Sequence, residues 1–414
     1  MKNDWKATVA ILGARKHYAV PAVLAAHGYL ERFYTDWYTF KSGWAGQIRS
    51  LLHYLPIKTF RRISTRSNTS LPDQLVKAFP FLGLSYALSL RMNGGEAVRE
   101  RVYVRYGRKF GEAVGDSGFG GSDLVYGMNT ASVELFQNAV QFNVKCVLEQ
   151  CSAPYSIYDQ LLLEEYSLWP NWALDETPHR NLHLSDREKQ EWNLSQLIVC
   201  GSQFVLDGLE LQGVPREKCI MIPSAVDLNN HPNKVNETRH IHSKLRVLFL
   251  GSISVMKGIQ YVYKALRQLE NSSIETRAAG GIMVNRQALT KMEEHIQFLG
   301  HVPRADVRNL LRWADVLVLP SISEGSALVT YEALASGVPV ITTPNSGSPV
   351  QDGVTGFIVP NRNAEAIAER LEQLAQNPEL RREMSINARK YAEEHLSWDA
   401  YATRLIAALE SVLD

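Results

Sequence analysis

The stretch from Leu319 to Gly337 constrains the fold of this chain most, because it reads as a strand, a loop and a helix in succession. The apolar run Val316 to Leu319 predicts a buried strand. The residues from Ala327 to Ala335 are mostly helix formers, and the glycine that follows them soon after can end a helix. A loop between a buried strand and a helix N-terminus leaves backbone N–H groups free to bind an anion. The sequence therefore predicts an α/β unit with an anion site at this loop.

Two glutamates bracket the predicted anion site: Glu324 in the loop just before the helix and Glu332 within the helix, with residues 325–331 between them. Backbone amides would hold a phosphate, and the two acids would accept hydrogen bonds from hydroxyl groups. A ligand with both parts is a sugar nucleotide. The alternative is that Glu324 caps the helix and Glu332 is a solvated surface acid, since acids are common at helix N-termini.

The residues around these glutamates favour the ligand site. The segment resembles the signature of family-4 glycosyltransferases, which runs close to PS-x-x-EG-x-G/A-L-x-x-x-EA-x-A-x-G-x-PV. The matching positions are Pro320, Ser321, Glu324, Gly325, Leu328, Glu332, Ala333, Ala335, Gly337, Pro339 and Val340. Members of that family are retaining enzymes of GT-B architecture. The resemblance implies an α/β fold of two Rossmann-like, doubly wound domains that face a cleft, with the donor on the C-terminal domain and the acceptor on the N-terminal one.

The order of the expected elements gives the domain boundaries. Alternating strand and helix patterns from Arg246 onward predict a parallel, doubly wound sheet. We assign residues 1–230 to an acceptor-binding domain, 231–243 to a polar linker, 244–396 to a nucleotide-sugar-binding domain and 397–414 to a last helix. The resemblance implies that this last helix crosses back onto the N-terminal domain.

The C-terminal half offers further candidates for donor binding. The run from Gly251 to Lys257 resembles a family loop whose lysine binds the donor diphosphate, although many members have arginine at the position of Ser252. Relatives hold the base with backbone groups of the loop at His301 and Val302. The resemblance implies a donor site formed by Gly251, Ser252, Lys257, Gly280, Gly281, His301, Val302, Ser323, Glu324, Gly325, Ser326, Ala327, Leu328 and Glu332, with Glu324 and Lys257 as the catalytic residues.

The N-terminal half supplies the candidates for acceptor binding. Thr8 to Gly13 reads as a buried strand, followed by a basic loop and a helical pattern through Leu30. Open α/β sheets bind ligands at the carboxyl ends of their strands. Where many family members have a histidine, this chain has Met128 and Asn129. The acceptor-side candidates are Arg15, His17, Asn129 and Glu149. Alternatively, the basic loop is a solvated edge and Glu149 caps a loop.

Two other segments depart from a plain α/β pattern. Residues 41–66 carry basic residues and no acid, and their apolar residues fall on one helical face, so they could lie on an anionic membrane surface or pack on the N-terminal domain. Tyr155 to Leu174 is rich in aromatic residues and acids. It would suit a cleft for acceptor sugars, since aromatic faces stack on sugars, and ordinary packing is the alternative.

Composition excludes several classes of protein. A net charge of +1 over 414 residues gives no global field for nucleic acid. The N-terminus lacks a signal-peptide pattern, no run approaches the length of a membrane span, and the cysteines lack zinc or redox spacing. We expect a cytoplasmic protein with reduced cysteines, which could be peripheral on the inner face of the cell membrane. No Asp-x-Asp motif ends an expected strand, so we expect neither a metal nor a cofactor.

The sequence therefore predicts a retaining, metal-independent glycosyltransferase. Its partners would be a nucleoside-diphosphate sugar, with UDP as the default, and a saccharide or lipid-linked acceptor in the synthesis of a cell-surface polysaccharide. The alternatives are a sugar-nucleotide epimerase on the same architecture and a non-catalytic nucleotide-binding scaffold. The Glu324-Gly-x-x-Leu context favours the transferase over the epimerase, and the intact set of Glu324, Lys257 and Glu332 argues against the scaffold.

Overall fold

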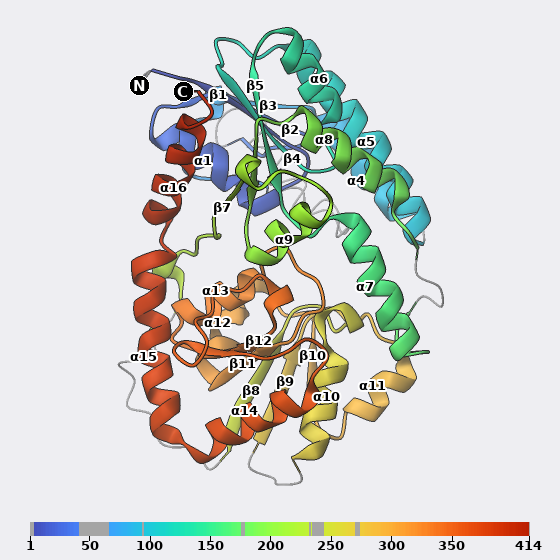
Figure 1. Cartoon of the computed structure of the whole chain (residues 1–414), viewed down its shortest axis with the longest axis vertical. Helices are drawn as coiled ribbons and strands as arrows, with labels where there is room; N and C mark the ends of the chain where they lie inside the picture. Colours follow the sequence, from blue (N-terminus) through green and yellow to red (C-terminus); the bar gives the residue numbers. More distant parts are fainter. Residues whose placement is uncertain are drawn as a thin grey trace.

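The apolar runs form two parallel β-sheets, one in each half of the chain (Figure 1). A computed structural model describes residues 4–40, 66–92, 95–174, 179–231, 233, 244–269 and 274–413. The basic segment 41–66, apart from Arg66, and most of the linker 231–243 lie outside this described part. Among the described residues, no helix combines the length and the apolar character needed to cross a bilayer.

The first sheet has seven strands in the order β3-β2-β1-β4-β5-β6-β7. Its strands are β1 (Ala7–Ile11), β2 (Leu30–Thr35), β3 (Val76–Ala78), β4 (Leu124–Met128), β5 (Lys145–Gln150), β6 (Leu197–Cys200) and β7 (Cys219–Met221). The helices of this half are α1 (Ala19–Ala26), α4 (Pro80–Met92), α5 (Glu96–Ser117), α6 (Val133–Gln141), α7 (Tyr155–Leu168), α8 (Leu182–Leu194) and α9 (Gln203–Leu211). The helical pattern expected through Leu30 was wrong, because α1 ends before Gly28, whose φ is +78°, and Leu30 begins β2.

The second sheet has six strands in the order β10-β9-β8-β11-β12-β13. Its strands are β8 (Leu245–Leu250), β9 (Ile274–Ala279), β10 (Gln297–Gly300), β11 (Val316–Leu319), β12 (Val340–Thr342) and β13 (Gly356–Ile358). The helices are α10 (Ile259–Gln268), α11 (Arg286–Met292), α12 (Arg304–Trp313), α13 (Leu328–Ala335), α14 (Ala364–Gln376), α15 (Pro378–His395) and α16 (Trp398–Glu410). The strand and the helix predicted around the central loop are both confirmed.

Each sheet is covered on both faces, which explains why central strands such as β1 and β11 read as continuous apolar runs and not as alternating ones. In the second half, one buried cluster includes Ile259 and Val262 of α10 with Leu371 of α14. The cluster on the opposite face includes Leu311 of α12 and Leu334 of α13. The two-domain, doubly wound α/β architecture expected from the sequence is therefore present.

The C-terminal helix crosses to the first half, as expected. α15 and α16 run along one side of the molecule and bring the C-terminus close to the N-terminus (Figure 1). The side chains of Tyr401, Leu405 and Leu409 lie in the buried cluster that surrounds β1. Burying a leucine side chain contributes roughly 1.5–3 kcal/mol, so this crossing is an integral part of the fold.

Candidate functional site

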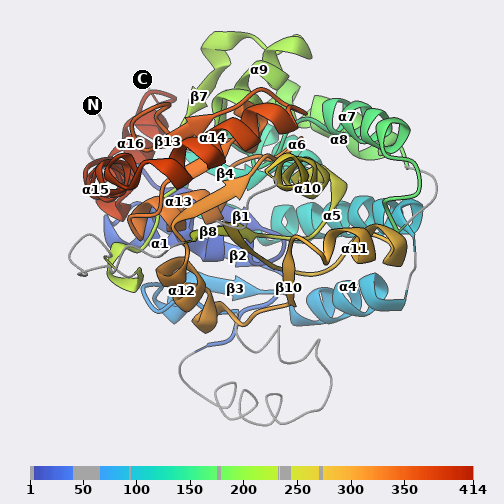
Figure 2. The ribbon, with the colours of Figure 1, turned by 90° about the horizontal axis from the view of Figure 1, so that it is seen from below.

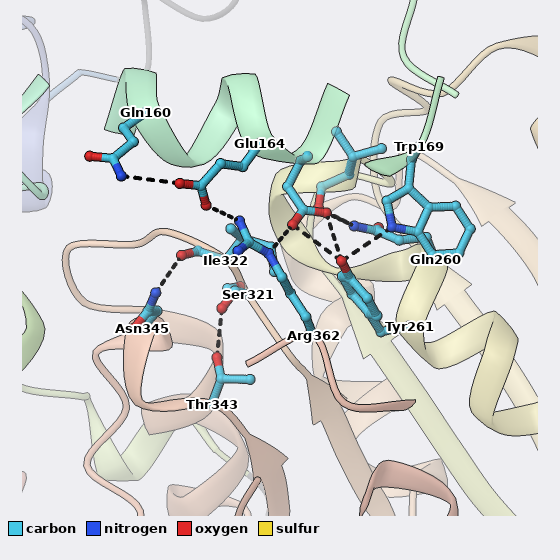
Figure 3. A network of polar contacts seen from close by, with 12 residues as sticks. Gln160, Glu164, Trp169, Gln260, Tyr261, Ser321, Ile322, Thr343, Asn345 and Arg362 are labelled. Atoms are coloured by element: carbon cyan, nitrogen blue, oxygen red, sulfur yellow. Dashed lines mark hydrogen bonds and ion pairs between the residues drawn. The ribbon is translucent and has the colours of Figure 1, made fainter. Parts of the chain in front are cut away.

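Hydrogen bonds from the segment after β12 fix the backbone of the loop between β11 and α13. The Thr343 hydroxyl donates to the Ser321 carbonyl at 2.6 Å, and the Asn345 amide donates to the Ile322 carbonyl at 2.8 Å (Figure 3). The Glu324 N–H donates to the Asn345 carbonyl at 3.0 Å. These bonds fix the backbone on which Glu324 stands. The side chain is therefore presented by a rigid support at the carboxyl end of a central strand.

The same loop lies against the first half of the molecule. The Ser202 hydroxyl donates to the Gly325 carbonyl at 2.6 Å. A Cβ atom at Gly325 would lie 1.7 Å from the Cys151 carbonyl oxygen, so only glycine fits there. The predicted anion loop thus forms part of the contact between the two halves.

Lys257 and Glu324, the two predicted catalytic residues, form an ion pair. Lys257 ends the short 3-10 turn η5 (Val255–Lys257), which follows β8, and both side chains are largely buried. Burial lowers the pKa of Lys257 to about 8, while the Glu324 carboxylate favours the charged form of the lysine. A diphosphate at this position would compete with Glu324 for the ammonium group.

Glu332 reaches toward the first half through Arg304, the first residue of α12. Arg304 Nη2 lies 3.8 Å from Glu332 Oε1, and Arg304 Nη1 lies 2.6 Å from His17 Nε2. Burial raises the pKa of Glu332, and Arg304 acts in the opposite direction. Burial and the nearby Arg304 both lower the pKa of His17. A neutral His17 can accept the hydrogen bond, so the two predicted site residues meet across the interface through Arg304.

A cavity of about 860 Å³ lies at this meeting point and is lined by residues of both halves. Its lining includes Lys16, His17, Ser224, Arg304, Leu328 and Glu332, but not Lys257 or Glu324. The cavity is therefore large enough for a small ligand at the Glu332 end of the site.

The other donor-site candidates lie at the same edge of the second sheet. Gly251 and Ser252 follow β8, Gly280 and Gly281 follow β9, and His301 follows β10. Gly251 N–H donates to the Ala279 carbonyl at 2.9 Å, and Gly280 N–H donates to the Gly300 carbonyl at 2.8 Å. The structure thus brings these residues to neighbouring strand ends, where α/β sheets bind ligands.

The basic loop after β1 takes a strained conformation, with φ of 47° at Lys16, 50° at His17 and 61° at Tyr18. Arg15 Nη1 donates to the Asn129 carbonyl at 2.8 Å and to its side-chain oxygen at 3.2 Å. Lys16 forms an ion pair with Glu149, whose other oxygen accepts a hydrogen bond from Tyr126 at 2.8 Å.

Asn129 and Glu149 are 3% and 1% exposed. Both side chains therefore point into the protein, where Asn129 binds Arg15 and Glu149 binds Lys16 of the basic loop.

Sequence reasoning missed a buried glutamate behind Asn129. Glu188 of α8 accepts hydrogen bonds from Asn129 at 3.0 Å, from Gln150 at 2.7 Å and from the Tyr155 N–H at 2.8 Å. Burial raises the pKa of Glu188 to about 7. Arg304 was missed too, although its place directly after the base-site loop was a usable signal. Among the described residues, no group of three or more His, Cys, Asp or Glu could hold a metal ion.

One protein family matches the second half of the chain. Residues 231–391 match the family model described as glycosyl transferases group 1. Over these residues the C-terminal half of the chain is therefore similar to group 1 glycosyl transferases. The match contains Lys257, Glu324 and Glu332, and so it covers the predicted donor site.

Curated relatives align with about half of the chain. Spore coat protein SA of Bacillus subtilis is 28% identical over 223 residues, which are 47% of this chain and 59% of that protein. The protein named putative colanic acid biosynthesis glycosyltransferase WcaL, from Escherichia coli, is 28% identical over 212 residues, 47% of this chain and 51% of that protein. The aligned region thus spans only about half to three fifths of these relatives.

Solved structures show the fold of the whole chain. HepE of Anabaena, solved in complex with UDP, has a TM-score of 0.64 at 15% identity, covering 98% of this chain and 100% of that one. At this identity the similarity establishes the fold alone. The two halves of the chain therefore form a GT-B fold together.

Proposed function

We propose that this protein is a retaining, metal-independent glycosyltransferase. It would move a hexose-type sugar from a nucleoside-diphosphate sugar to a saccharide or lipid-linked acceptor, in the synthesis of a cell-surface polysaccharide or glycoconjugate on the cytoplasmic side of the membrane. UDP is the favoured nucleotide, because HepE was solved with UDP and with UDP-glucose.

One observation carries this proposal. Lys257 of η5 pairs with Glu324 at the carboxyl edge of the second sheet, and Glu324 stands on the loop before the helix that presents Glu332. This edge of the sheet thus combines a cation, backbone amides at a helix start and carboxylates, which are the groups that a sugar nucleotide requires. Relatives with names such as colanic acid biosynthesis glycosyltransferase support the choice of product.

In the proposed reaction, the bond between the sugar C1 and the donor phosphate breaks, and the acceptor oxygen bonds to C1 on the same face. The leaving phosphate takes the acceptor proton. Lys257 and the amides of the loop stabilise the negative charge that develops on the leaving diphosphate, which lowers the barrier electrostatically. Glu324 holds hydroxyl groups of the transferred sugar, and Glu332 accepts hydrogen bonds from the ribose.

A metal-free thermal-shift screen with UDP, GDP, ADP and their common sugars tests the donor site. A nucleotide at a hundredfold its dissociation constant should add roughly 2.7 kcal/mol to the stability of the folded state. We expect one diphosphate to raise the melting temperature, and we expect Glu332→Ala to abolish that rise. Glu383→Ala, an exposed acid of α15, is the control that should retain it.

A transfer assay separates the proposed enzyme from its alternatives. Glu324→Ala should lose sugar transfer while it still binds the nucleotide. Conversion of the nucleotide sugar to its epimer without an acceptor would indicate an epimerase instead. Binding without any turnover of the wild type would indicate a scaffold, and the absence of a shift with every nucleotide would refute the donor site.

A further inference from the structure

Helix α7 belongs to the first half by sequence but packs on the second half. It follows β5 of the first sheet, yet its Leu162 shares a buried cluster with Val255 and Met256 of η5. Beyond the helix, the Trp172 carbonyl accepts a hydrogen bond from the Asn285 N–H at 2.8 Å. Seen from below, α7 lies beside α10 (Figure 2). The helix is therefore attached to the half that carries the donor site. The aromatic segment Tyr155 to Leu174, predicted to bind acceptor sugars, contributes side chains to the buried core of that second half.

Glu165 is the charged centre of this attachment, and Figure 3 labels three residues that bind it, Gln260, Tyr261 and Arg362. Its side chain is 0% exposed. Its carboxylate accepts hydrogen bonds from Gln260 Nε2 at 2.8 Å, from the Tyr261 hydroxyl at 3.0 Å and from Arg362 Nε at 2.5 Å. A buried carboxylate needs such partners, because burying an unpaired charge is strongly unfavourable. The three donors therefore fix Glu165, and Glu165 in turn fixes them.

Gln260 connects Glu165 to the turn that carries Lys257. The amide nitrogen that donates to Glu165 also donates to the Val255 carbonyl at 2.8 Å, and Val255 is the first residue of η5. The turn is held on its other side too. Gly258, directly after Lys257, has a φ of +77°, and a Cβ atom there would lie 2.1 Å from the Pro320 carbonyl oxygen. The Lys257 backbone is thus held between α7 and the donor loop.

We propose that Glu165 is a positioning residue for Lys257. Glu165 fixes the Gln260 amide, the amide fixes η5, and the turn holds the Lys257 ammonium where the donor diphosphate would bind. The proposal rests on the proposed function, since it gives Lys257 the role of phosphate ligand. It makes a residue of the first half a supporting part of the donor site on the second.

The neighbouring Glu164 provides a matched control. It binds the same arginine, with Arg362 Nη2 at 2.7 Å, but its side chain is 38% exposed. It makes no hydrogen bond to Gln260 among those that the described residues show. Glu164→Gln therefore weakens the surface contact with Arg362 and leaves the connection to η5 intact.

Two variants break the connection itself. Glu165→Gln keeps the size of the side chain, but its amide offers one acceptor oxygen and turns N–H groups toward other donors. Gln260→Met keeps Glu165 and its bonds to Tyr261 and Arg362 but removes both hydrogen bonds of the bridge from Glu165 to Val255, so it decides the question even if Glu165→Gln fails to fold. Circular dichroism and melting temperature identify the variants that fold.

The first readout is the rate at which an amine-acylating reagent modifies Lys257 in the ligand-free protein, followed by mass spectrometry. A released turn exposes the ammonium group and loosens its pairing with Glu324. We expect several-fold faster modification in Glu165→Gln and in Gln260→Met, and the wild-type rate in Glu164→Gln. Equal rates in Gln260→Met and Glu164→Gln would overturn the proposal, whether or not the protein binds a nucleotide.

The second readout is the affinity for UDP, measured by calorimetry. Loss of one hydrogen bond near a charged group predicts roughly tenfold weaker binding in Glu165→Gln. In a Lys257→Met background the same substitution should have no further effect, because the two residues act through one contact. An equal loss in both backgrounds would show that Glu165 acts by another route. A wild type that binds no nucleoside diphosphate would refute the proposed function, and the modification rates would still decide the positioning role.

Discussion

Replacing Gly325 by alanine tests whether the donor loop and the first half are in rigid contact. The added Cβ atom would lie 1.7 Å from the Cys151 carbonyl oxygen, whereas real Cβ contacts essentially never fall below 3.0 Å. The carbonyl belongs to the backbone and the position of the Cβ atom is fixed by the backbone, so neither can rotate away. One backbone must move, and that movement also stretches the 2.6 Å hydrogen bond from Ser202 to the Gly325 carbonyl. Overpacking of this kind costs about 1–3 kcal/mol.

The assay is the melting temperature of Gly325→Ala beside that of Gly121→Ala. Gly121 has no atom within 4 Å of its added Cβ and no positive φ, so this control measures the effect of a methyl group alone. A loss of 1 kcal/mol lowers the melting temperature by about 2–4 °C in a domain of some 200 residues. We expect a drop of several degrees for Gly325→Ala and weaker binding of UDP. Melting temperatures within a degree of each other for the two variants would refute the rigid contact.

Three other substitutions, Lys16→Met, Leu405→Ala and Glu191→Gln, test separate parts of the structure. Lys16→Met leaves the buried Glu149 unpaired and should cost about 3–5 kcal/mol, and the double variant with Glu149→Gln should recover part of that loss. Leu405→Ala removes a fully buried side chain of α16 and should cost about 2–5 kcal/mol in urea unfolding; a smaller loss would contradict its place in the core of the first half.

Burial also raises the pKa of Glu191 from 4.5 to about 8, so the folded state binds a proton that the unfolded chain releases, and stability should fall as the pH rises from about 5 to 8. Glu191→Gln should flatten that fall, and an unchanged pH profile of the melting temperature would contradict the raised pKa.

The parts of the fold that the sequence predicts well are those that depend on local patterns. Val316 to Leu319 is a short apolar run followed by proline, and it is a buried strand with those bounds. The helix from Leu328 ends before Gly337, whose φ is +66°, as the position of the glycine indicated. In both cases neighbouring residues in the sequence are sufficient to determine the backbone. The donor-site candidates follow from the same patterns, because parallel strands bring their carboxyl ends to one edge.

The roles of the acceptor-side candidates depend on contacts that a local pattern does not contain. Asn129 and Glu149 end neighbouring strands, and this place suggested that they face a ligand. Asn129 instead turns toward Glu188, which lies 59 residues further along the chain. The strand pattern predicts the position of a residue along the sheet edge. The direction of its side chain depends on the charged groups of the helices packed there, such as Glu188 of α8. Arg15 and Lys16 are half-buried at this edge, where they bind the inward-pointing Asn129 and Glu149.

Glu164 and Glu165 show most clearly that a local sequence pattern does not determine which side chain is buried. They are adjacent, identical in type and on one helix, and nothing in the surrounding sequence distinguishes them. A helix turns by about 100° per residue, so neighbouring residues point in different directions, and the second half of the molecule determines which direction is buried. Gln260, which binds Glu165, is 95 residues away in sequence. The fold therefore buries Glu165 beside the turn of Lys257, although the local sequence would place its charge in solvent.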